Sequence, residues 1–206
     1  QMHGTFNNRY GYGLYMTGKS YTNLDKLNFL RYNNGIYYYN NSSNNTITSV
    51  TCNSNNSAGI YYTNSHNNVI TSAVCSQNGS VGIYYYNTNT NNTITSATCS
   101  SNSFCGIYYY NGSNNNTIIN AVCNSNDSTG INYTGSNNNA ITSATCNSNN
   151  YGIYYDSSNN NNIYALSTTG NTTAGIYSNT ANNICHSATI AESTKVATGT
   201  TYYANT

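Results

Sequence analysis

Charged residues are unusually rare in this sequence. Only 4% of its 206 residues are Asp, Glu, Lys or Arg, and the formal net charge at pH 7 is +1. Typical soluble proteins carry roughly 25% charged residues. A chain with so few charges offers no electrostatic footprint for nucleic acid or for an anionic membrane surface. We therefore expect neither of them among its partners.

Long apolar runs are missing as well. No run approaches the roughly 20 consecutive apolar residues that a bilayer-spanning helix needs, so we expect no membrane span. The chain begins with Gln1 rather than Met and carries no signal peptide, which is typical of a mature, processed product. We expect a secreted protein, either extracellular or on the cell surface.

Pro and Trp are absent and charged residues are rare, whereas Asn is abundant: 45 of the 206 residues are Asn, and another 24 are Tyr. Low-charge, Asn-rich chains are often disordered or prone to cross-β stacking. Against disorder, Gly-Ile pairs recur every 22 to 24 residues and open seven repeats. A fixed period in this range predicts a solenoid, in which each coil buries its apolar face against its neighbours. The repeats begin at Gly35, Gly59, Gly82, Gly106, Gly130, Gly152 and Gly175.

One repeat, residues 35–58, shows how the chain makes a coil. Residues 36–39 (Ile-Tyr-Tyr-Tyr) are β-prone, and residues 40–45 form an Asn-rich corner. Residues 46–48 and 50–52 then read as two further short strands with apolar side chains inward. Three strands and three corners in about 23 residues predict a triangular parallel β-helix. The missing helical periodicity argues against a leucine-rich or helical solenoid.

Stacking such coils roughly 4.8 Å apart turns equivalent residues into columns. The first Tyr of each Gly-Ile-Tyr-Tyr unit points outward by strand alternation, and the second shares the inward face with Ile. An outward aromatic column could bind sugars by stacking, form a contact face in an assembly, or simply stabilise the solenoid. On a chain with so little charge we favour the contact face. The outward column consists of Tyr37, Tyr61, Tyr84, Tyr108, Tyr154 and Tyr177.

The repeat string Gly-Ile-Tyr-Tyr-x-Asn-x-x-Asn-Asn-x-Ile, as it stands at residues 59–70, resembles the parallel β-helix repeat of secreted and cell-surface proteins. That group includes pectate-lyase-like enzymes, periplasmic copper-site maturation proteins and microbial surface adhesins. The resemblance implies a right-handed β-helix over residues 35–185. We expect residues 1–34 to form an N-terminal cap with a degenerate first coil. Residues 186–206 are expected to form one or two strands that cap the other end or contact the next subunit.

Catalytic and metal-binding residues are hard to find. The four carboxylates, Asp25, Asp127, Asp156 and Glu192, do not converge, whereas polysaccharide enzymes of this fold need paired acids. We therefore expect no catalytic residue, no cofactor and no enzymatic activity.

Five cysteines fall in a single column two residues after the small aliphatic positions. A parallel file of thiols does not converge as metal ligands do, and thiols in register do not present disulfide geometry. We expect a reduced core column and no metal site. The members of the column are Cys52, Cys75, Cys99, Cys123 and Cys146.

Outward threonines flank the second Ile column. Their Thr-x-Thr array is similar to the ice-binding face of β-solenoid antifreeze proteins, although Val69, Ile119 and Ala140 interrupt it. Thr is also simply a favourable exposed strand residue. The candidate ice or ligand face comprises Thr46, Thr48, Thr71, Thr93, Thr95, Thr117 and Thr142.

Sequons for N-glycosylation occur mostly in the predicted corners, where a glycan would be accessible. Many arise by chance in a chain so rich in Asn, Ser and Thr. The candidate acceptors are Asn40, Asn41, Asn44, Asn55, Asn78, Asn91, Asn111, Asn115, Asn126, Asn132 and Asn171.

These observations favour a non-enzymatic structural protein, the subunit of an extracellular fibre, sheath or surface layer. Its main partner would be itself, end-to-end or laterally, because a β-helix has open edges at its first and last coil. The alternative is an adhesin-like binding module for ice or for glycans.

Overall fold

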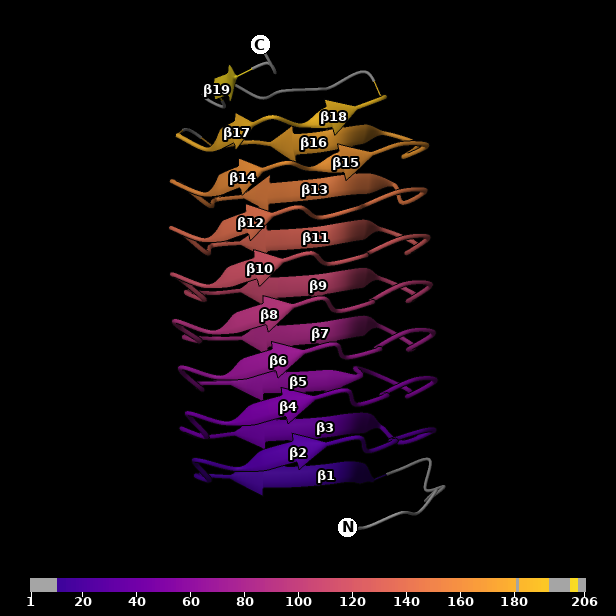
Figure 1. The fold of residues 1–206 in the computed structure, drawn as a ribbon, viewed down its shortest axis with the longest axis vertical. Coiled ribbons are helices and arrows are strands. Elements are labelled where there is room, and N and C mark those ends of the chain that lie inside the picture. Colours follow the sequence, from indigo (N-terminus) through magenta and orange to yellow (C-terminus); the bar gives the residue numbers. More distant parts are fainter. Residues whose placement is uncertain (1–10, 181, 193–200, 204–206) are drawn as a thin grey trace.

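The computed structural model describes residues 11–180, 182–192 and 201–203, and every regular element among them is a β-strand. Figure 1 shows the strands stacked as successive coils of one elongated solenoid, with β1 and β19 at opposite ends. Within the described part of the chain, no helix is long and apolar enough to cross a bilayer.

The longer strands form one parallel sheet of eight, which we call the first sheet (Figure 1). Its register pairs each residue with its counterpart one repeat away, for example Ile36 with Ile60 and Tyr37 with Tyr61. Its strands, in order, are β1 (Tyr12–Thr17), β3 (Asn34–Tyr39), β5 (Ile60–Thr63), β7 (Val81–Tyr86), β9 (Cys105–Tyr110), β11 (Thr129–Thr134), β13 (Tyr151–Asp156) and β16 (Ala174–Ser178).

Shorter strands form a second parallel sheet of nine. They are β2 (Asn23–Asp25), β4 (Thr46–Thr48), β6 (Val69–Thr71), β8 (Thr93–Thr95), β10 (Thr117–Ile119), β12 (Ala140–Thr142), β14 (Asn162–Tyr164), β17 (Ile184–His186) and β19 (Thr201–Tyr203).

A third side of the coil is made mostly of single parallel bridges, which run from Asn28–Thr51 to Thr145–Ser167. It ends in the paired strands β15 (Ser167–Thr168) and β18 (Thr189–Ile190). Each coil therefore has three sides. The right-handed, triangular parallel β-helix expected from the sequence is confirmed.

Regular pairing extends beyond the clearest repeats. Strand β1 pairs with β3 and β2 with β4, so residues 12–25 contribute a coil of the same kind. At the other end β17 continues the second sheet and pairs in parallel with β19. The rest of the expected terminal caps, residues 1–10, 193–200 and 204–206, lies outside the described residues.

The core is a bundle of columns. The Ile, Val, Ala and Cys positions predicted to face inward are buried, and the five column cysteines are free thiols. The second Tyr of each unit is buried too, and neighbouring rings stack with centroids 4.8–5.3 Å apart. The stacked rings are those of Tyr38, Tyr62, Tyr85, Tyr109, Tyr133 and Tyr155.

Asparagine builds two further buried columns at the corners. In each, the Oδ1 atom of one Asn accepts the backbone N–H and the Nδ2 of the Asn one coil before it, at 2.8–3.2 Å. These bonds stabilise turns that would otherwise bury unpaired polar groups. The first column runs through Asn45, Asn68, Asn92, Asn116, Asn139, Asn161 and Asn183, and the second through Asn55, Asn78, Asn102, Asn126, Asn149 and Asn171.

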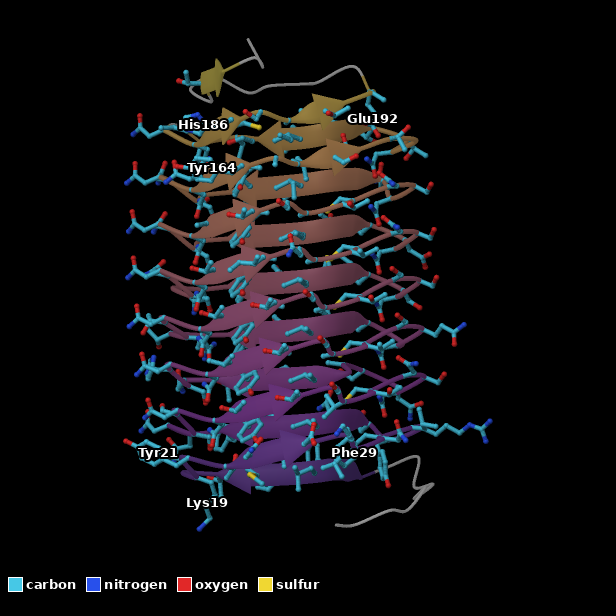
Figure 2. The ribbon with its side chains drawn as sticks, viewed as in Figure 1. Lys19, Tyr21, Phe29, Tyr164, His186 and Glu192 are labelled. Atoms are coloured by element: carbon cyan, nitrogen blue, oxygen red, sulfur yellow. The ribbon has the colours of Figure 1, made fainter. Side chains whose placement is uncertain are left out.

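Glu192 ends the second Asn column. Its Oε1 accepts the backbone N–H and the Nδ2 of Asn171 at 2.9 and 2.7 Å, and its Oε2 accepts the hydroxyl of Thr168 at 2.6 Å. Figure 2 places Glu192 near the C-terminal end of the solenoid. A carboxylate suits this position because the last Asn of the column has only donors left to satisfy.

Candidate functional site

The outward side chains of the first sheet form an aromatic surface that we call the tyrosine face. Strand register places its central column in one line, and the rings pack against each other with centroids 4.7–5.5 Å apart. Because each ring leans on the next, most of these side chains are half-buried. The column reads Tyr15, Tyr37, Tyr61, Tyr84, Tyr108, Asn132, Tyr154 and Tyr177.

One position breaks this column. On β11 the residue in register with Tyr108 and Tyr154 is Asn132, so one coil carries a short amide in place of a phenol ring. The missing ring leaves an open notch of about 270 Å³. We call this cavity the notch; it is lined by Phe104, Ser128, Thr129, Asn132, Tyr151 and Tyr154.

Aromatic rings form the two walls of the notch. On one side Phe104 packs edge-on against Tyr108 at 5.7 Å. On the other, Tyr151 packs against Tyr154 at 5.1 Å and against Tyr177 at 5.6 Å. Elsewhere along the central column neighbouring rings pack against each other, whereas at the notch the ring of Tyr154 borders the cavity.

The floor of the notch is polar. Asn132 is only 6% exposed; its Oδ1 accepts the hydroxyl of Thr134 at 3.1 Å, and its Nδ2 donates to the Cys105 sulfur at 3.9 Å. The Ser128 and Thr129 hydroxyls lie 3.2 Å apart. Amide and hydroxyl groups between aromatic walls are the composition of a site that orients a partly polar ligand.

Two carboxylates flank the notch. Asp127 is exposed and directly precedes Ser128, and Asp156 follows Tyr154 by two positions on the outward side of β13. Burial is the main reason that the pKa of the Tyr154 phenol is raised, and the negative charge of Asp156 raises it further. The negative charge of Asp156 therefore acts on one wall of the notch, at Tyr154.

The structure sorts the predicted glycosylation sites into two groups. Five of the eleven Asn side chains are buried, four of them inside the second Asn column and Asn132 in the floor of the notch. The folded protein has no room for a glycan on Asn55, Asn78, Asn126, Asn132 or Asn171. Six remain exposed and stay predictions: Asn40, Asn41, Asn44, Asn91, Asn111 and Asn115.

The candidate threonine face lies on the second sheet, where the strands pair in register. The apolar residues Val69, Ile119 and Ala140 stand in the same two columns and break the array. Towards the C-terminal end one of these columns becomes aromatic, and the rings of Tyr164 and His186 stack at 4.8 Å (Figure 2). The threonines are therefore not one continuous surface, and ice binding stays a prediction.

The cysteine column does not form a metal centre. All five thiols are buried, and burial is the main reason that the pKa values of Cys75 and Cys99 lie well above the usual value for a thiol. A cysteine that binds a metal must be deprotonated to a thiolate, and burial of these side chains disfavours the thiolate form. Among the described residues, no group of three His, Cys, Asp or Glu side chains is placed to hold a metal ion.

Sequence reasoning missed most of the notch. Asn132 was singled out only as a sequon, and Phe104 and Tyr151 were not singled out at all. The available signal was the column itself, because Asn132 is the one non-aromatic residue in a line of tyrosines.

Solved structures of enzymes share this fold. The chain superimposes on the periplasmic alginate epimerase AlgG with a TM-score of 0.72 at 18% identity, covering 84% of this chain and 48% of that one. It superimposes on the A-module of the Azotobacter vinelandii mannuronan C-5 epimerase AlgE6 with a TM-score of 0.71 at 16% identity, covering 90% of this chain and 59% of that one. It superimposes on the enzymatically active domain of tailspike protein 2 of bacteriophage CBA120 with a TM-score of 0.74 at 16% identity, covering 86% of this chain and 32% of that one.

At these identities the likeness shows the shared fold, and the chain spans about half the length of the epimerases. Our expectation of a non-enzymatic fibre subunit is nevertheless wrong, because the matching structures are epimerases and an enzymatically active tailspike domain. The expectation that the protein is not an enzyme is contradicted by the same matches.

No curated protein sequence matches the chain. A protein-family match, however, covers residues 2–205, almost the whole length. The chain belongs to the family described as periplasmic copper-binding protein (NosD).

Proposed function

We propose that this protein recognises a polysaccharide on its tyrosine face and holds one sugar ring in the notch. The observation that carries the proposal is the break at Asn132, where a polar-floored cavity lies between aromatic walls in a column of stacked tyrosines.

A sugar ring matches this chemistry. Its C–H faces pack well on aromatic rings, and its edge of hydroxyls needs donors and acceptors such as those of Ser128 and Asn132. The cavity volume of about 270 Å³ is close to the lower end of the roughly 300–1,000 Å³ of small-molecule sites. It therefore suits one ring of a longer chain rather than a large compact ligand.

The proposal places the polymer along the solenoid axis. Tyr37, Tyr61 and Tyr84 continue the aromatic surface from coil to coil on one side of the notch, and Tyr177 continues it on the other. Neighbouring sugars would contact these rings on either side of the anchored unit. Contacts repeated at each coil strengthen binding without a deep pocket.

The similar proteins support the choice of ligand class. Two are epimerases whose names give alginate and mannuronan as substrates. The family description and the name of AlgG both say periplasmic, which favours a place outside the cytoplasm for this chain as well.

Copper, which the family description names, does not fit the residues described. The cysteines are sealed in the core, and no cluster of three potential ligands occurs among residues 11–180, 182–192 and 201–203. The proposal therefore includes no step through a metal.

Binding is tested with the variant Asn132→Tyr, which restores the ring found at this position in the other coils. Titration calorimetry with a panel of oligosaccharides should show binding to the wild type and at least a roughly tenfold weaker affinity for the variant, because the notch is filled. The same mixtures are assayed for new reducing ends and for altered sugars, so that turnover is detected with binding.

The matched control is Thr95→Tyr, which adds the same ring to the outward side of the second sheet. It should bind as the wild type does. Equal affinity of the wild type and Asn132→Tyr for every ligand that binds would contradict the proposal, provided that circular dichroism shows both folded.

A further inference from the structure

We propose that the notch selects sugars by charge: it prefers a positively charged amino sugar to a neutral sugar, and it excludes uronic acids. The inference rests on the proposed function, because it names the sugar class that the same site would take. It differs from the alginate named for the epimerases, since alginate is built from uronic acids.

The two carboxylates beside the notch carry the argument. Asp156 stands on the outward side of β13, two residues beyond the wall residue Tyr154. Its Oδ1 accepts hydrogen bonds from the Nδ2 of Asn179 at 2.6 Å and from the Ser157 hydroxyl at 3.2 Å. Both of these bonds fall on one oxygen of the carboxylate, and both donors are neutral, so they leave the negative charge of Asp156 in place.

Asp127 adds a second negative charge next to Ser128, in the corner that precedes β11. It is exposed, and the next residue, Ser128, lines the cavity. Its backbone N–H donates to the carbonyl of Asn102 at 3.1 Å, which fixes this corner relative to the coil below. The ligand would therefore bind beside two carboxylates.

Cations that could neutralise a uronic acid are far away. The described basic residues Lys19, Lys26 and Arg31 all belong to the first coil, and Figure 2 shows Lys19 at the N-terminal end. Arg31 lies three residues before β3, and three strand spacings separate β3 from β9, which at roughly 4.8 Å each is about 14 Å. This exceeds the Debye length of roughly 8 Å at physiological salt. The other two basic residues, Arg9 and Lys195, lie outside the described residues.

The walls act in the same direction as the carboxylates. The faces of Tyr and Phe rings carry partial negative charge and attract an ammonium group within about 6 Å of the ring centre. Phe104, Tyr151 and Tyr154 border the cavity, so an amino group would meet ring faces as well as carboxylates. A uronic acid carboxylate would meet negative charge beside the cavity, and no Lys or Arg among the described residues lies near enough to offset the cost of removing it from water.

The test compares three oligosaccharides of equal length at mildly acidic pH and low salt: glucosamine, N-acetylglucosamine and mannuronate oligomers. We expect the glucosamine oligomer to bind roughly tenfold more tightly than the neutral one, and the mannuronate oligomer to bind at least roughly tenfold more weakly. High salt should shrink both differences, because these charges are exposed to solvent.

The double variant Asp127→Asn and Asp156→Asn should remove the preference for glucosamine and leave the affinity for the neutral oligomer unchanged. Asp25→Asn, which removes a carboxylate from the distant first coil, is the control and should keep the wild-type order. A mannuronate oligomer that binds the wild type as tightly as the neutral one would overturn the inference. An unchanged glucosamine preference in the double variant would overturn it as well.

The two proposals fail differently. If neutral oligomers bind the wild type and not Asn132→Tyr, but charge makes no difference, only the charge selection is wrong. If no oligomer of any charge binds, the proposed function fails and the inference fails with it.

Discussion

At the scale of single residues, asparagine side chains stabilise this fold in the way that charge pairs and a large core stabilise other proteins. Its side chain is both donor and acceptor, so a column of identical residues satisfies itself from coil to coil. The sequence predicts Asn stacking at the corners, and the structure adds that two of these columns are fully buried. The sequons at Asn55 and Asn126 illustrate the limit of motif reading, because a three-residue pattern carries no information about burial.

Asn102→Ala tests the second Asn column at its centre. The change removes the Oδ1 that accepts the backbone N–H and the Nδ2 of Asn78, both at 3.0 Å. Two buried donors are left without partners, so the free energy of unfolding should fall by about 2–4 kcal/mol. Urea denaturation followed by circular dichroism measures it. Ser103→Ala, one residue along and exposed, is the control and should change it by less than about 0.5 kcal/mol.

Glu192→Gln tests the carboxylate that ends this column. Burial raises the pKa of Glu192, but hydrogen bonds from Thr168 and Asn171 outweigh it, so the net pKa lies below the usual value. A lowered pKa in the folded state adds stability above the unfolded pKa, and this stability is lost as pH falls through the folded pKa. The wild type should therefore lose stability on acidification to below about pH 4. The Gln variant should lose less, and identical pH profiles of the two proteins would contradict this role.

At the scale of the strand, the Gly-Ile pair marks the place where two coils approach most closely. A Cβ on Gly106 would lie 2.6 Å from the carbonyl oxygen of Gly130 and 2.9 Å from the Cβ of Cys123. The sequence predicts that Gly serves either a positive φ or close approach between coils, and the structure selects close approach. The inward and outward columns follow from strand alternation and are predictable. The notch is not, because it depends on which residue of one coil lies beside Tyr108 and Tyr154.

Gly106→Ala should destabilise the solenoid more than Gly135→Ala. Gly135 has a φ of +59°, and a Cβ added there would lie 3.8 Å from the nearest heavy atom. Ala at this position therefore causes backbone strain of about 1–2 kcal/mol but no steric clash. At Gly106 the added methyl group meets backbone and must push two coils apart, which should cost at least about 3 kcal/mol. Thermal unfolding of both variants compares the two effects. A smaller loss for Gly106→Ala would refute the close-packing explanation.

At the scale of the whole molecule, stability rests on neutral side chains stacked in register. The period and the columns predict this architecture, since each coil contacts only its neighbours. Function is harder to predict, because the notch takes residues from three successive coils and its walls, Phe104 and Tyr151, lie outside the regular Gly-Ile-Tyr-Tyr unit. The fibre hypothesis failed for a related reason. A column of outward tyrosines, considered without the interruption at Asn132, is equally compatible with a contact face in an assembly and with a ligand-binding surface.

High pH should unfold this protein, whereas the range from pH 5 to 8 should change its stability little. Burial raises the pKa of Tyr62 and Tyr109 well above 10.0, and that of Tyr38 to about 12. The pKa of Cys75 is raised well above 9.0 for the same reason. Groups with raised pKa values add stability below their unfolded pKa, and this stability is lost as pH rises through the folded pKa.

The loss should begin near pH 9, where unfolded thiols start to ionise, and should continue towards pH 12. Each buried group contributes up to about 1.4 kcal/mol per pH unit in that window. Melting temperatures measured from pH 5 to 11 test this directly. A constant melting temperature between pH 8 and 11 would mean that the buried columns do not exist as described.

The most direct test of the central claim is a crystal structure of the protein with a bound glucosamine oligosaccharide. We expect one sugar ring between Phe104 and Tyr151, above Asn132, with the rest of the oligomer lying along the tyrosine face. A sugar bound on the second sheet, or a tyrosine face left bare while the oligosaccharide binds elsewhere, would contradict it.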